Sequence, residues 1–168
     1  MESIRRAQTG RVIACNLSCF PTPALGKQVI YNAMMATLNE GDEVIIPAPY
    51  WVSYPDIVLL AGGKPIILEC NEKQGFKINP SQLEKSITKK TKWIILNSPS
   101  NPTGACYAEK DIKEIGKILE KHPHVFILSD DIYEHVTYEN FKFFTIAQID
   151  RLKDRGLTMN GGRKAYSM

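Results

Sequence analysis

The chain has 168 residues, of which 43% are apolar and 23% charged, enough apolar sequence for the core of one domain. Its 21 basic and 18 acidic residues nearly balance, so the net charge of +3 does not indicate a nucleic-acid-binding protein. Ordinary glycine and proline contents exclude collagen-like and low-complexity classes, and no apolar run approaches the ~18–20 residues of a membrane span.

Residues 1–25 lack the regular pattern of the rest of the chain. Arg5, Arg6 and Arg11 precede a short apolar stretch, but the apolar core of a signal peptide is missing before Cys15. We therefore expect a cytoplasmic protein with reduced thiols. The four cysteines lack the close pairing of zinc and redox motifs, so no metal site is predicted.

From Gly26 onward, helical and extended patterns alternate. Apolar residues three or four apart predict helices, and short runs rich in β-branched residues predict buried strands. In chain order we expect a helix at 26–38, a strand at 43–47, a helix at 52–60, a strand at 64–69, a helix at 80–87, a strand at 92–97, a helix at 108–121, and strands at 125–128 and 157–160. Continuous apolar strands between helices predict an α/β fold, with a mostly parallel sheet flanked by helices on both faces.

The residues directly after each strand are the candidates for a functional site, because ligands of parallel sheets bind beyond the carboxyl ends of the strands. Trp51, Asn101, Asp130, Tyr133 and Lys164 all follow predicted strands. An aromatic ring, an amide, a carboxylate, a phenol and an amine together suit pyridoxal phosphate. This cofactor needs a stacking surface, hydrogen-bond donors, a partner for its ring nitrogen and an amine for a Schiff base.

Each of these residues also has an ordinary structural interpretation, and the residues alone leave the choice open. Trp51 fits a half-buried core aromatic, Asn101 a turn residue before proline, and one of Asp130 and Asp131 a helix cap. Tyr133 fits a packing residue, and Lys164 fits a solvated surface charge.

Four longer segments resemble the class I aminotransferases, and among them the bacterial aspartate aminotransferases. The segments are residues 41–55, 97–104, 129–134 and 160–168, in the order and at the spacing of that family. The resemblance covers residues 26–168 and implies part of the large, cofactor-binding domain of the fold-type I pyridoxal phosphate enzymes. Residues 1–25 do not resemble the family and are expected to form an atypical N-terminal segment.

The resemblance implies that Lys164 is the catalytic lysine, which forms the Schiff base with pyridoxal 5'-phosphate and then moves the proton. Asp130 matches the aspartate that pairs with the ring nitrogen and makes the ring an electron sink. Tyr133 matches the tyrosine that hydrogen-bonds the phenolate oxygen. Asn101 matches the asparagine that contacts the same oxygen and the region of the substrate carboxylate.

Three further residues match parts of the family's binding site. Trp51 matches the aromatic that stacks on the cofactor ring and lines the substrate pocket. Gly26 and Lys27 match the turn into the helix whose amide groups receive the phosphate. No metal takes part.

The implied reaction transfers an amino group between aspartate and 2-oxoglutarate. The partners are then small amino acids and 2-oxo acids, without nucleic acid or membrane, and the family forms homodimers. Aromatic and prephenate aminotransferases are the near alternatives, because the arginines that would bind the substrate carboxylates are not part of the resemblance.

Three departures from the family pattern suggest a function of another class, an inactive truncated remnant. Leu25 and Arg163 stand where the family has a glycine and a small hydroxyl residue, and complete members are more than twice as long. We therefore expect that this chain alone binds pyridoxal phosphate weakly and does not transaminate.

Overall fold

The computed structural model of the chain describes residues 11–12 and 25–161. The secondary structure follows in chain order: β1 Arg11–Val12, α1 Leu25–Thr37, β2 Glu43–Ala48, α2 Ser53–Leu60, β3 Lys64–Glu69, the 3-10 helix η1 Glu72–Gln74, α3 Pro80–Ser86, β4 Thr91–Asn97, α4 Glu109–Glu120, β5 Phe126–Asp130, the 3-10 helices η2 Ile146–Gln148 and η3 Lys153–Arg155, and β6 Gly156–Met159. Every helix and strand expected from the sequence is present, with ends shifted by at most two residues. The strand β1 and the three 3-10 helices were not predicted, because segments of two or three residues are too short to show a period.

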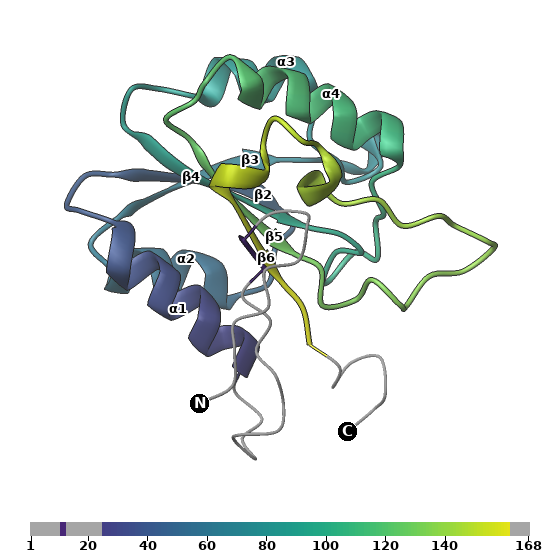
Figure 1. The fold of residues 1–168 in the computed structure, drawn as a ribbon, viewed down its shortest axis with the longest axis horizontal. Helices are drawn as coiled ribbons and strands as arrows, with labels where there is room; N and C mark the ends of the chain where they lie inside the picture. Colours follow the sequence, from purple (N-terminus) through teal and green to yellow (C-terminus); the bar gives the residue numbers. More distant parts are fainter. Residues whose placement is uncertain (1–10, 13–24, 162–168) are drawn as a thin grey trace.

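The described strands form one sheet in the order β1-β6-β5-β4-β2-β3, and every neighbouring pair is parallel. The helices α1 and α2 lie on one side of this sheet, and α3 and α4 lie on the other (Figure 1). The predicted α/β class with a parallel sheet flanked by helices is therefore confirmed. Since all the strands run in one direction, the segments that follow them emerge along a single edge of the sheet.

Alternate residues of each central strand supply two separate cores. Ile94 of β4 packs into the core beneath α3 and α4, whereas the next residue, Ile95, packs into the core beneath α1 and α2. Likewise, Ile45 of β2 belongs to the first core and Ile46 to the second. These four side chains are at most 1% exposed. The sheet is thus buried on both faces, which explains why its strands are continuously apolar instead of alternating.

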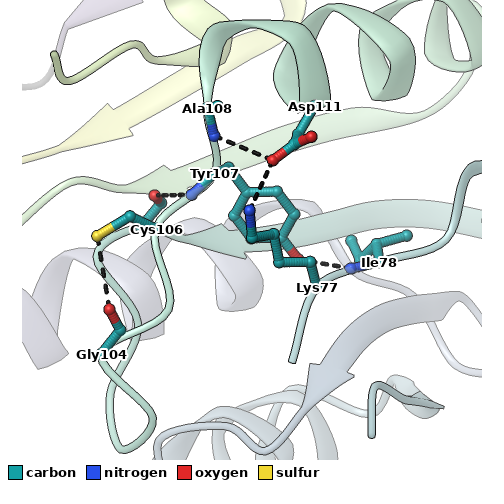
Figure 2. A network of polar contacts seen from close by, with 8 residues as sticks. Lys77, Ile78, Gly104, Cys106, Tyr107, Ala108 and Asp111 are labelled. Atoms are coloured by element: carbon teal, nitrogen blue, oxygen red, sulfur yellow. Dashed lines mark hydrogen bonds and ion pairs between the residues drawn. The ribbon is translucent and has the colours of Figure 1, made fainter. Parts of the chain in front are cut away.

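The connection between β4 and α4 is fixed to the rest of the fold by polar contacts (Figure 2). The buried Tyr107 hydroxyl accepts a hydrogen bond of 2.9 Å from the Ile78 backbone N–H, and the Tyr107 N–H donates to Ser98 Oγ at 3.0 Å. Lys77 Nζ lies 2.8 Å from Asp111 Oδ2 in the first turn of α4. The segment between residues 98 and 107, which contains Asn101, is therefore anchored at both ends.

A half-buried arginine joins the start of β6 to the end of α4. Arg155 Nη1 donates hydrogen bonds to the backbone carbonyls of His122 and Val125, at 2.7 and 2.6 Å, and Nη2 donates to that of Leu119. The carbonyls of Leu119 and His122 also accept backbone N–H bonds in the turns that follow α4, so the guanidinium is a second donor to them. It thereby ties the end of α4 to the segment that enters β6. In the part of the chain that the structure describes, no helix is long and apolar enough to cross a membrane.

Candidate active site

A cavity lies beyond the carboxyl ends of β2, β4, β5 and β6, next to the start of α1. Its volume is about 130 Å³, close to the ~150 Å³ of an engineered cavity that accepts a benzene ring. The lining residues are Gly26, Lys27, Trp51, Tyr54, Asn97, Asn101, Asp130, Ile132, Tyr133 and Met159. The structure thus brings together Gly26, Lys27, Trp51, Asn101, Asp130 and Tyr133, which are all the candidate residues in its described part. Lys164 and Arg163 lie outside the described residues.

Asp130 is the last residue of β5 and is only 4% exposed. Its Oδ2 accepts a hydrogen bond of 2.5 Å from the Tyr54 hydroxyl, and its Oδ1 accepts one of 3.3 Å from the Ile132 backbone N–H. Burial raises the pKa of this carboxyl to about 6, although both hydrogen bonds act in the opposite direction. The helix-cap interpretation of Asp130 is wrong, because the residue ends a strand and turns follow it.

Asn97, the last residue of β4, connects two of the candidate residues. Its Nδ2 donates to the Asp130 backbone carbonyl at 2.9 Å, and its Oδ1 accepts from the Asn101 N–H at 2.8 Å. One side chain therefore holds the ends of two neighbouring strands and turns the following loop toward the cavity. Asn101 lies in a turn, as its structural interpretation predicts, and it also lines the cavity.

Trp51 is half-buried, as its structural interpretation predicts. It packs against the core beneath α1 and α2, and it also lines the cavity. Its ring meets that of Tyr54 edge to face, with centroids 5.4 Å apart and an angle of 86°. Lys27 Nζ lies 5.3 Å from the centre of the Trp51 ring, within the range of a cation–π contact. The rim of the cavity thus combines an aromatic surface with a positive charge.

The comparison with known proteins identifies the family of this chain. Residues 26–168 match the family model of aminotransferase class I and II. The chain belongs to this family. The resemblance to class I aminotransferases that the four segments indicated is thereby confirmed.

Named relatives of this chain match the same part of it. The probable aspartate/prephenate aminotransferase of Rickettsia bellii is 61% identical over 144 residues, and the aspartate/prephenate aminotransferase of Cereibacter sphaeroides is 58% identical over 144 residues. Each match covers 85% of this chain and 36% of the relative. The crystal structure of the aspartate aminotransferase from Rhizobium meliloti superposes with a TM-score of 0.83 at 51% identity, again over 85% of this chain and 36% of the other. The chain therefore spans about a third of the length of these relatives.

The described residues of this aminotransferase chain fit pyridoxal phosphate. Among them, Asp130 has no cationic partner, and a buried carboxylate without one is costly to keep charged. A protonated pyridine nitrogen is a cation that a carboxylate in an aromatic-lined cavity can bind. Trp51 offers the flat apolar surface that such a ring requires, while Asn101 and Tyr133 add polar groups to the same lining.

A second buried carboxylate, Asp131, lies beside the cavity but outside its lining. Its two oxygens accept hydrogen bonds from Ser129 Oγ and Thr145 Oγ1, both at 2.8 Å, and its backbone N–H donates to the Met159 carbonyl, also at 2.8 Å. Burial, chiefly, raises the pKa of Asp131 to about 7, and the charges of Asp130 and Glu134 add to this effect. The carboxyl thus fastens the end of β5 to Thr145, just before η2, while the Asp131 backbone N–H joins the same segment to β6.

The Glu134 side chain continues this connection toward the end of the described chain. Its Oε1 accepts a hydrogen bond from Asn160 Nδ2, while Asn160 Oδ1 accepts one of 2.6 Å from the Gly161 N–H. The loop after β5 therefore holds the backbone that leads toward Lys164. The sequence did not place Asn97, Asp131 or Glu134 among the candidate residues of the cofactor site.

The two buried aspartates predict that the chain is more stable in mild acid than at neutral pH. Their pKa values are higher in the folded than in the unfolded chain, so the folded state holds protons that unfolding releases between about pH 4 and pH 7. Stability is expected to fall through this interval, with Asp131 contributing about 2–4 kcal/mol of the decrease. Urea denaturation of the wild type and of Asp131→Asn at pH 4, 5, 6, 7 and 8 measures this contribution.

In Asp131→Asn, the free energy of unfolding is expected to fall between pH 4 and pH 7 by about half as much as in the wild type, because Asp130 still titrates. The exposed Asp150 provides the control, since Asp150→Asn removes a carboxyl that carries no such burial. An identical pH profile for the wild type and Asp131→Asn would contradict the prediction.

Proposed function

We propose that these residues form the cofactor site of a pyridoxal-phosphate-dependent aminotransferase that exchanges an amino group between aspartate and 2-oxoglutarate. The observation that supports it most directly is the position of Asp130, a buried carboxylate without a described cationic partner, in one cavity with Trp51, Asn101 and Tyr133. Family membership supports the same chemistry. The cytoplasmic location, the homodimer and the separate character of residues 1–25 remain predictions.

When bound, pyridoxal phosphate supplies a protonated ring that withdraws electrons from the amino-acid Cα. Asp130 holds the proton on the ring nitrogen, because its negative charge stabilises the positive one. Trp51 would cover the ring and exclude water from that side. Asn101 and Tyr133 would hydrogen-bond to the phenolate oxygen, and the first turn of α1, with Gly26 and Lys27, would receive the phosphate.

Lys164 carries out the proton transfer in this proposal. Its amine would hold the cofactor through a Schiff base and would serve as the general base that accepts the proton from the amino-acid Cα. An amine must be neutral to accept that proton, and a nearby positive charge favours the neutral form. The assignment rests on the family resemblance of residues 160–168.

The charge at the rim of the cavity favours a substrate with two carboxylates. Lys27 places its ammonium group above the Trp51 ring, where it can attract a carboxylate of a substrate as well as a phosphate. Aspartate and 2-oxoglutarate both carry a second carboxylate. Prephenate also does, and it is the second candidate because the relatives from Rickettsia bellii and Cereibacter sphaeroides are named for both substrates.

Covalent trapping tests the proposal. The 168-residue chain is mixed with pyridoxal phosphate, reduced with borohydride and digested, and the peptides are analysed by mass spectrometry. We expect the added mass on Lys164, and its loss at that site in Lys164→Arg. Equal labelling of Lys27, Lys164 and the surface lysines would contradict the proposal.

Turnover by the intact, unreduced chain in the presence of pyridoxal phosphate tests the remaining alternatives. Aspartate with 2-oxoglutarate and prephenate with an amino donor are compared as substrate pairs. Efficient turnover by the isolated chain would contradict the expectation that it does not transaminate alone, and the preferred pair would decide between the two substrate assignments.

A further inference from the structure

We propose that Tyr54 is a positioning residue that holds Asp130 in its ionised form and leaves one carboxylate oxygen available to the cavity. The sequence alone did not single out Tyr54. The inference deepens the proposed function, since a fixed negative charge at this place serves a cationic ring. The contact itself can be tested without any cofactor.

The geometry of the contact is specific. Tyr54 is the second residue of α2 and is 2% exposed, and its hydroxyl reaches across to the end of β5. The oxygen–oxygen distance of 2.5 Å to Asp130 Oδ2 is in the range of hydrogen bonds between a hydroxyl and a charged oxygen. Within residues 25–161, the hydrogen bond recorded for the other carboxylate oxygen, Oδ1, is the 3.3 Å contact with the Ile132 N–H. Since a carboxylate oxygen accepts two hydrogen bonds, Oδ1 retains capacity for a ligand.

Toward the ionised carboxylate the tyrosine is the donor. Burial raises the pKa of Tyr54 well above its ordinary value, and the neighbouring Asp130 charge adds to this effect. The hydroxyl therefore keeps its proton over the whole range in which proteins work. The edge-to-face contact with Trp51 restricts the ring, so the hydroxyl stays directed at the carboxylate.

The other charged and titratable groups around Asp130 give little help in keeping it ionised. Tyr133 and Asp131, which follow Asp130 in the chain, carry a phenol and a carboxyl, and neither group is a cation. Lys27, which lines the same cavity, is directed to the Trp51 ring. The Tyr54 hydroxyl is thus the strongest described interaction that favours the charged form.

A change in this hydrogen bond matters because Asp130 titrates close to neutral pH. With a pKa of about 6, roughly nine-tenths of the Asp130 carboxyls are ionised at pH 7. Loss of a hydrogen bond to a charged acceptor is expected to raise this pKa by about one to two units. Half or more of the molecules would then carry a neutral Asp130 at pH 7.

The decisive experiment measures the pKa of Asp130 in the 168-residue chain without cofactor. Carbon-13 NMR follows the aspartate carboxyl resonances with pH, and Asp130→Asn identifies the resonance of interest. Tyr54→Phe keeps the ring and removes only the hydroxyl, so we expect its Asp130 pKa to rise by about one to two units. An unchanged pKa in Tyr54→Phe would overturn the proposal.

Tyr107→Phe is the matched control. Tyr107 is also a buried tyrosine, 3% exposed, but its hydroxyl bonds the Ile78 backbone. Both variants lose a buried hydroxyl and are expected to lose comparable stability, whereas only Tyr54→Phe moves the Asp130 pKa. An equal shift in both variants would show a general effect of loosened packing and would overturn the proposal.

A second measurement links the contact to the cofactor. The affinity of each variant for pyridoxal phosphate is measured between pH 5.5 and 8.5 by absorbance titration. We expect Tyr54→Phe to bind about two- to tenfold more weakly at pH 7 and to regain affinity above its raised Asp130 pKa. Wild-type affinity at every pH would overturn the link to binding, whereas no binding by any variant would overturn the proposed function and leave the pKa measurement to decide the role of Tyr54.

Discussion

Replacing Asp130 by asparagine is expected to weaken the binding of pyridoxal phosphate by about 100-fold or more at pH 7. Removing one partner of a buried ion pair costs about 3–5 kcal/mol, and each 1.4 kcal/mol corresponds to a factor of ten in affinity. The substitution keeps the shape of the side chain, and the amide oxygen can still accept the Tyr54 hydroxyl. The effect should therefore fall on ligand binding more than on folding.

Absorbance titration of the cofactor into the wild type and Asp130→Asn measures this loss. Asp150→Asn is the control for a change of one charge, because that side chain is 92% exposed and remote from the cavity lining. Its affinity should match that of the wild type. Comparable affinity of Asp130→Asn and the wild type would remove the central support for the proposed function.

Arg155→Ala is expected to give the largest loss of stability, about 3 kcal/mol. The substitution leaves the carbonyls of Leu119, His122 and Val125 without their common donor, and hydrogen bonds that involve a charged group contribute about 1.5–3 kcal/mol. The three contacts share one side chain, so their contributions do not add fully.

Urea denaturation at pH 7 measures the free energy of unfolding of each variant. Arg151→Ala is the matched control, because Arg151 is 81% exposed and forms a single ion pair at 3.3 Å with Glu120. Exposed pairs contribute about 0–1 kcal/mol, so its stability should stay close to that of the wild type. Equal losses in Arg151→Ala and Arg155→Ala would contradict the assignment of Arg155 as the link between α4 and β6.

The course of the chain through the sheet could be predicted because its signals are local. Ile94 and Ile95 illustrate this: consecutive apolar residues predict a strand that is buried on both faces, and each lies in a different core. The same rule placed Trp51, Asn101, Asp130 and Tyr133 at one edge, since parallel strands deliver their following residues together. Their roles came from the family resemblance and remain predictions.

The polar contacts around the cavity could not be predicted, because each joins side chains distant in the sequence. Tyr54 and Asp130 are 76 positions apart, and Asn97 and Asp130 are 33 apart. Tyr54 did carry one signal, since it lies three residues after Trp51 at the first turn of a helix. Asp130 was open to interpretation as a helix cap because nothing in the local sequence shows that β5 continues for two residues beyond its apolar run.

The arrangement of the cavity has a consequence for the time course of folding. Gly26, at the start of α1, faces Met159, at the end of β6: a Cβ atom added to the glycine would lie 3.5 Å from the methionine sulfur. Both residues line the cavity, so segments far apart in the sequence close it together. Contacts of such long sequence separation form late, after most of the loop-closure entropy has been lost. Ligand affinity should therefore appear only in the last phase of refolding, after helices have formed, and would report when the whole sheet is complete.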